Sequence, residues 1–213
     1  MRWDLVRFDL TRGLPAALGV LGDELGAWDR IRAMARFAWR SATTDPFAAL
    51  GPAASAAESF TRHQLRPVLL FDAVLREDLE RAPEEAQEIL LRLVGEIGAA
   101  FIDASVRHPS VEEWRKMSEA DRAAFARGAI DRFENARGEV VEVGERSFGL
   151  DITFCHFADL ARRLGRPDLA PLFCHADAVY YGRPESEIRL TRDETIAAGA
   201  ERCAFRFRLD ERP

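Results

Sequence analysis

Hydrophobic residues recur along the chain with two periods, and the change of period separates its helical part from its strands. Up to about residue 135 they are spaced three and four apart, which is typical of helices with one buried face. We expect about four to five such helices, four of which begin at Trp28, Pro67, Pro83 and Ser118. Their expected inward positions are Trp28, Ile31, Met34, Ala35 and Ala38; Leu70, Val74 and Leu75; Leu90, Val94, Ile97 and Phe101; and Phe125, Ala129 and Phe133.

The C-terminal part alternates with a period of two, which predicts strands with one buried face. We expect strands over 139–143, 148–154, 187–197 and 202–209, and two short helices over 158–165 and 167–174. The first dozen residues alternate weakly and are interpreted as an arm or edge strand. The pattern as a whole predicts an α+β fold, with N-terminal helices packed on a small antiparallel sheet.

The chain has 213 residues, a length that one large domain can accommodate. We therefore expect a single domain over 1–213. Within it we distinguish a helical N-terminal extension over 1–60, a helical support over 61–146 that leads into the first strand, and a site-bearing α+β core over 147–208. The loop rich in Pro, Gly and small residues at 43–56 is interpreted as a boundary or a lid.

Charge and composition limit the partners. The net charge of −6 disfavours nucleic acid, because neutralising phosphates requires a basic face. The sequence lacks an apolar run long enough to cross a membrane, and its first residues lack the apolar core of a signal peptide, so we expect a cytoplasmic protein. The three cysteines are then expected to be thiols. Whether the protein forms a homodimer is left open.

Cys155 is the best candidate for a nucleophile, because it lies where a strand meets a helix. Free N–H groups and the helix dipole lower the pKa of a thiol at a helix N-terminus. The alternative is a small buried residue behind the helix. Cys174 is placed near the end of its predicted helix, where the dipole disfavours a thiolate, so its case depends on neighbours. Cys203, on the apolar face of the last strand, is interpreted as core or pocket wall.

Four polar residues complete the candidate site. His175 could act as base to Cys174, and Asp177 could orient that base, although each could equally be a surface or capping residue. Arg192 shares its predicted strand face with Ile188 and Leu190, so we expect it to end a buried stripe or to bind an anion such as a carboxylate. Thr195 would need a bulge or turn to join Arg192.

A zinc site is the main rival interpretation, since Cys, His and Asp are zinc ligands. The sequence has neither the CxxC nor the HExxH spacing that would indicate one, and adjacent Cys-His pairs diverge. We therefore expect neither a metal nor a cofactor.

The order of residues in the C-terminal part resembles the L-2-amino-thiazoline-4-carboxylic acid hydrolase family. The residues that carry this resemblance are Cys155, Leu164, Gly165, Pro167, Leu169, Cys174, Asp177, Arg192, Thr195, Gly199, Cys203 and Phe205. The closing strand pair is also similar to the small-molecule-binding domain found with 4-vinyl reductases. Asp193 and Ala200 stand where the family pattern usually has Thr and Gly, which leaves the substrate open.

The resemblance implies a hydrolase of a small cyclic C–N bond, acting on an aminothiazoline carboxylate and giving a carbamoyl amino acid. Cys155, Cys174 and Asp177 would then be catalytic, and Arg192, Thr195 and His175 would bind the carboxylate substrate. Two alternatives remain: a non-catalytic binding or sensor module, and a related enzyme of natural-product metabolism with a different substrate.

Overall fold

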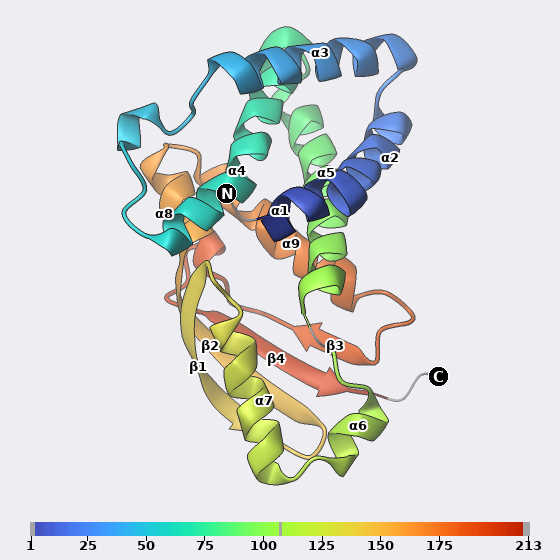
Figure 1. Cartoon of the computed structure of the whole chain (residues 1–213), viewed down its shortest axis with the longest axis vertical. Coiled ribbons are helices and arrows are strands. Elements are labelled where there is room, and N and C mark those ends of the chain that lie inside the picture. Colours follow the sequence, from blue (N-terminus) through green and yellow to red (C-terminus); the bar gives the residue numbers. More distant parts are fainter. Residues whose placement is uncertain (1–2, 107, 211–213) are drawn as a thin grey trace. The chain divides into compact units, whose positions relative to one another are not determined.

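The computed structural model describes residues 3–106 and 108–210 and confirms the α+β class (Figure 1). Helices come first, and a four-stranded antiparallel sheet follows. The chain divides into two compact units, unit 1 up to Ala104 and unit 2 from Ser105 onward. This division does not coincide with the boundaries drawn at residues 60 and 146, and the single domain stays a prediction.

Unit 1 is helical throughout. Its elements are α1 (Trp3–Phe8), η1 (Asp9–Gly13), α2 (Leu14–Glu24), α3 (Ala27–Thr43), η2 (Ala48–Leu50), α4 (Ala56–Ala73), η3 (Val74–Asp78) and α5 (Pro83–Ser105). The arm or edge strand expected for the first dozen residues is wrong where the structure describes them, since helix begins at Trp3; residues 1 and 2 lie outside the described part. In the ranges 3–106 and 108–210, no helix combines the length and apolar character needed to cross a membrane.

The helix expected to begin at Pro67 begins eleven residues earlier, at Ala56. The hydroxyl of Ser55 accepts a hydrogen bond from the N–H of Glu58 at 3.0 Å, which caps this earlier start. Pro67 lies inside α4, a position that sequence rules disfavour because proline cannot donate the backbone hydrogen bond. The expected burial of Leu70 and of Val74, which begins η3, is confirmed.

The stripe expected to face inward on α3 is wrong. Trp28 and Ile31 remain 70% and 61% exposed, and Ala35 and Ala38 are exposed as well. The buried residue of this helix is Ala33. The helix therefore presents its larger apolar stripe away from unit 1.

Unit 2 holds the sheet and the candidate site. Its elements are α6 (Val111–Lys116), α7 (Glu119–Asp131), β1 (Ala136–Val143), β2 (Ser147–Cys155), α8 (His156–Arg163), η4 (Pro167–Leu169), α9 (Ala170–Tyr181), β3 (Ile188–Thr191), η5 (Ile196–Ala198) and β4 (Cys203–Leu209). The strand order is β1-β2-β4-β3, with every neighbouring pair antiparallel.

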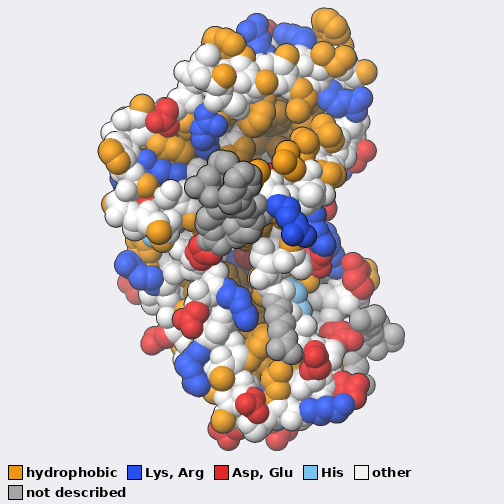
Figure 2. Space-filling view, in the orientation of Figure 1, with side chains coloured by type: hydrophobic (Ala, Val, Ile, Leu, Met, Phe, Trp, Pro, Cys, Tyr) orange, Lys and Arg blue, Asp and Glu red, His pale blue; other side chains and the backbone are white. Residues whose placement is uncertain are grey.

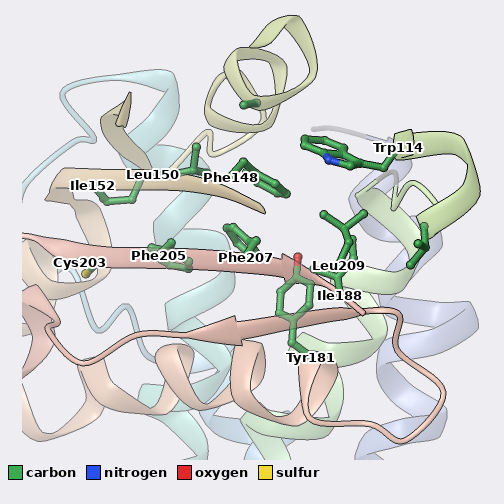
Figure 3. Packing of buried hydrophobic residues seen from close by; sticks show 12 residues of the cluster. Trp114, Phe148, Leu150, Ile152, Tyr181, Ile188, Cys203, Phe205, Phe207 and Leu209 are labelled. Atoms are coloured by element: carbon green, nitrogen blue, oxygen red, sulfur yellow. The ribbon is translucent and has the colours of Figure 1, made fainter. Parts of the chain in front are cut away.

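The core of unit 2 lies on one face of this sheet (Figure 3). The expected alternation of β4 is confirmed: Cys203, Phe205, Phe207 and Leu209 are buried, and the residues between them are not. Phe207 stacks on Phe148 of β2 with ring centroids 4.6 Å apart. Trp114 of α6 contacts the same Phe148 at 5.4 Å, so aromatic rings join α6 to the sheet.

The opposite side of β4 carries arginines, as the alternation predicts. Arg202 and Arg206 each form an ion pair of 2.8 Å with Asp151 of β2, whose side chain is 7% exposed. Because a buried carboxylate is stable only when it is paired, the two arginines compensate Asp151. Their ion pairs with Asp151 therefore hold β2 and β4 together.

Candidate functional site

Cys155 lies where the sequence places it. It is the last residue of β2 and the N-cap of α8, with an extended backbone (φ −133°, ψ 118°). The thiol makes no capping hydrogen bond of normal geometry, although the N–H groups of Ala158 and Phe157 still act to favour its thiolate. Half-buried, Cys155 packs against Ala158 and Ala161 of α8 and Ala170 of α9.

The helix that carries Cys174 continues seven residues further than predicted. It ends at Tyr181, before Gly182, so Cys174 lies in its second turn and not at its C-terminal end. The unfavourable dipole position assumed for this thiol is therefore wrong. Because Cys174, Asp177 and Tyr181 are three and four residues apart, α9 presents all three on one face.

Arg192 follows β3 directly, because the strand ends at Thr191 and not near residue 197 as expected. Its guanidinium donates through Nη1 to Asp177 at 2.6 Å and through Nη2 to the carbonyl oxygen of Cys174 at 2.7 Å. The Arg192 guanidinium also lies over the Phe205 ring, 4.6 Å from its centroid. These three contacts dock the end of β3 onto α9 and β4.

The Arg192–Asp177 ion pair is largely removed from water, with side chains 10% and 19% exposed. Burial raises the pKa of Asp177, and the charge and hydrogen bond of Arg192 oppose this rise without cancelling it. For Arg192, burial would lower the pKa, but the neighbouring Asp177 raises it above its usual value. Asp177 is therefore a carboxyl group that takes up a proton more readily than an exposed one.

All three cysteines are free thiols, and burial raises the pKa of each. The pKa of Cys174 reaches about 12, because desolvation and the charge of Asp177 outweigh the favourable charge of Arg192. The lowered pKa expected for Cys155 is wrong for this structure, since desolvation exceeds the effect of the two N–H groups. The charge of Asp177 contributes to the raised pKa of all three thiols.

Cys203, Thr195 and His175 are the remaining candidates. The Cys203 sulfur accepts a hydrogen bond from the N–H of Ile196 at 3.2 Å, which ties β4 to η5. Thr195 is the N-cap of η5, and its hydroxyl accepts from the N–H of Ala198 at 3.2 Å. His175 is half-buried, and its position on α9 is about 100° around the helix axis from that of Cys174. The structure thus joins Cys174, Asp177 and Arg192 directly and gives Thr195 a capping role.

Sequence reasoning did not single out Tyr181, and it named Phe205 only as part of the family resemblance. Tyr181 is buried on the Asp177 face of α9, where desolvation and Asp177 raise its pKa, and Phe205 carries the Arg192 guanidinium. The spacing of three and four residues from Cys174 to Asp177 and Tyr181 could have indicated Tyr181. The predicted helix ended at residue 174, so this spacing was not followed to Tyr181. Among the described residues, no three His, Cys, Asp or Glu side chains are grouped so that they could hold a metal ion.

Comparison with known proteins places these residues in one family region. A family model described as L-2-amino-thiazoline-4-carboxylic acid hydrolase matches residues 61–207, which include every candidate site residue. No curated protein matches the chain. One solved structure that matches is an H-NOX protein from S. oneidensis in the Fe(II)NO ligation state. It is 12% identical in sequence, the match covers 94% of this chain and 100% of that chain, and the TM-score is 0.34. A Tt H-NOX double variant matches with 12% identity, 95% and 96% coverage and a TM-score of 0.34.

Proposed function

Because the chain belongs to the L-2-amino-thiazoline-4-carboxylic acid hydrolase family, we propose that it hydrolyses a ring C–N bond of a small cyclic amidine that carries a carboxylate. The substrate class is aminothiazoline carboxylate, and the product is a carbamoyl amino acid. The observation that carries this proposal is the buried Asp177–Arg192 pair among three thiols, within the matched region.

The reaction needs an acid–base group beside the ring nitrogen. Water adds to the amidine-like ring carbon, and the ring nitrogen takes up a proton. Collapse of the tetrahedral carbon to a carbonyl then breaks the ring C–N bond and passes a second proton to the leaving nitrogen. The ring carbon keeps its exocyclic nitrogen and its sulfur, so the product equals substrate plus one water.

Asp177 is the acid–base group in this proposal. A catalytic acid is most effective when its pKa lies near the working pH, and burial shifts the pKa of Asp177 in that direction. A substrate carboxylate arriving nearby would raise this pKa further, because two like charges disfavour each other's ionisation. Binding would thus promote uptake of the proton that Asp177 later gives to the ring nitrogen, a contribution of ~10²–10⁴ in rate.

Arg192 is the carboxylate-binding group. A guanidinium has five N–H donors, and the contacts to Asp177 and Cys174 use two of its nitrogens. A substrate carboxylate would share the cation with Asp177 and would not displace it. In this proposal Thr195 and His175 would contact the substrate beside Arg192.

Two nucleophiles fit this reaction. In the first route water attacks directly, and the thiols of Cys155 and Cys174 form the wall of the site. In the second route one of these thiols adds to the ring carbon, and the ring C–N bond breaks as its nitrogen takes up protons. Water then adds to the same carbon and releases the thiol, which gives the same product. The raised pKa of both thiols favours the water route, because a thiol must lose its proton before it can attack.

A non-catalytic binding module is the second candidate, and one observation favours it. Asp177 and Arg192 are paired with each other and burial raises the pKa of all three thiols, which a site that only holds a carboxylate ligand would tolerate. Such a module would bind the aminothiazoline carboxylate without converting it.

The experiment compares turnover with binding for the same compound. Purified protein is incubated with aminothiazoline carboxylate in ¹⁸O-water, and mass spectrometry follows a carbamoyl product that gains one heavy oxygen. Arg192→Lys keeps the charge but loses the planar donor set, so it should weaken binding of the acid and leave the carboxamide analogue unaffected. Asp193→Asn, which changes the exposed neighbouring carboxylate, serves as the matched control. Calorimetric binding without product would establish the binding module and refute the enzyme.

A further inference from the structure

Helix α3 has two apolar faces, and unit 1 uses only one of them. The inner face carries Ala33, which is fully buried, and Phe37, whose ring meets the Phe71 ring of α4 at 5.9 Å. The outer face carries Trp28, Ile31 and Trp39, which are 70%, 61% and 56% exposed. Figure 2 shows hydrophobic side chains at the surface over α3, at the top of the view, beside basic ones.

The outer face has the spacing of a helix-pairing seam. Its exposed apolar positions are Trp28, Ile31, Ala35, Ala38 and Ala42, with Trp39 beside them. Steps of three, four, three and four residues repeat every seven residues, which is the a/d pattern of helices that pack along their length. A surface helix of a monomer normally has one apolar stripe, so the second one indicates a partner.

We propose that this seam is the self-association surface of the protein, on which α3 of a second copy lies antiparallel across a two-fold axis at Ala35. About that axis, Ile31 lies opposite the partner's Trp39, and Trp28 lies opposite the partner's Ala42. Large side chains thus meet smaller ones at both ends. Ala35 meets itself, and its small side chain lets the two helices approach closely. A surface that fits itself in this way is what a two-fold dimer requires.

The exposed area suits a weak dimer. Given ~250 Å² for a complete tryptophan side chain, Trp28 and Trp39 expose on the order of 300 Å² per copy. Ile31, the alanines and the stems of flanking arginines extend this toward the ~800 Å² per partner of a standard interface. We therefore expect dimerisation in the micromolar range, where it depends on concentration.

The charges beside the seam favour a second copy over an anionic membrane. Arg32 pairs with Asp29 at 3.6 Å, and Arg36 and Arg40 pair with Asp78 at 3.7 Å and 2.6 Å. A helix that binds anionic lipid directs arginine charge to the headgroups, whereas each of these arginines has a carboxylate partner within unit 1. Pairing of the flanking arginines reduces the charge repulsion between two copies of the seam.

Sedimentation equilibrium of the full chain from ~1 to ~200 μM tests the proposal. The parent should form dimers, Ile31→Arg and Ala35→Arg should weaken association at least tenfold, and Val141→Arg, at an exposed apolar residue of β1, should dimerise like the parent. Far-UV circular dichroism checks that each variant is folded.

The antiparallel geometry has a separate test. Under mild oxidation, Ala35→Cys should crosslink to its own copy, whereas Ala27→Cys, at the exposed start of α3, should not. A parent that stays monomeric at the highest concentration, or a dimer that survives both arginine substitutions, overturns the proposal. Co-sedimentation of monomer with phosphatidylserine vesicles, lost in Ile31→Arg, would assign the seam to a membrane instead.

Discussion

Replacing Arg192 by Met should destabilise the protein strongly and in a pH-dependent way. The substitution keeps much of the side-chain volume and removes the guanidinium, which donates to Asp177 at 2.6 Å and to the carbonyl of Cys174 at 2.7 Å. Breaking a buried ion pair from one side costs ~3–5 kcal/mol, because the remaining charge has lost its solvent and its partner. The loss of contact with the Phe205 ring adds ~0.5–2 kcal/mol.

The pH dependence follows from Asp177. Its pKa is already above the usual value in the parent, and without Arg192 it should rise further. Below this raised pKa the folded variant binds a proton that the unfolded chain binds only near pH 4, so the penalty should shrink as the pH falls from 7 toward 4. Urea unfolding followed by circular dichroism at both pH values measures this.

A double-mutant cycle separates the pair from general damage. Asp177→Asn with Arg192→Met should cost at least ~2 kcal/mol less than the sum of the single changes, because neither charge is left alone. A loss below ~1 kcal/mol, the same at pH 7 and pH 4 and additive with Asp177→Asn, would refute the reasoning. Asp193→Asn should change stability by less than ~0.5 kcal/mol, as an exposed control.

Four further predictions follow from the thiols and helix caps. Iodoacetamide at pH 7 should label Cys155 more slowly than a free thiol, with a rate that rises above pH 9; fast labelling at pH 7 would contradict the raised pKa. Stability should fall by about 1 kcal/mol per pH unit from pH ~9 to ~12, because the unfolded chain releases the Cys174 proton first, and Cys174→Ser should flatten this slope. Elemental analysis should find no stoichiometric zinc, and a chelator should leave the midpoint of thermal unfolding unchanged. One zinc per chain would contradict the description of the cysteines as free thiols. Ser118→Ala should cost ~1 kcal/mol in urea unfolding because it removes the capping box with Asp121, and an unchanged midpoint would argue against that cap.

The sequence predicts best where one physical signal dominates. Strand β4 alternates because one face is core and the other is solvent, so its buried residues could be identified without a structure. Cys155 at the junction of β2 and α8 could be placed because strand and helix signals meet there. Local signals of this kind fix the element and the face of a residue.

Other features depend on contacts between distant residues. The strand over 187–197 was predicted too long because Arg192 turns inward to meet Asp177, an attraction across fifteen residues that periodicity does not report. On α3, the stronger apolar stripe faces outward, so choosing the most hydrophobic face gave the wrong orientation. The raised thiol pKa values arise from burial, which a position at a helix N-terminus does not reveal.

The rate of ring opening of aminothiazoline carboxylate by the parent and by Asp177→Asn tests the central claim most directly. Liquid chromatography with mass detection measures the carbamoyl product, with Asp193→Asn as the control for an exposed carboxylate next to Arg192. We predict measurable turnover by the parent and the control, and a loss of ~10²–10⁴ in Asp177→Asn while the variant remains folded and still binds the substrate. Equal turnover by all three proteins, or ligand binding with no product from any of them, would contradict the proposed acid–base role of Asp177.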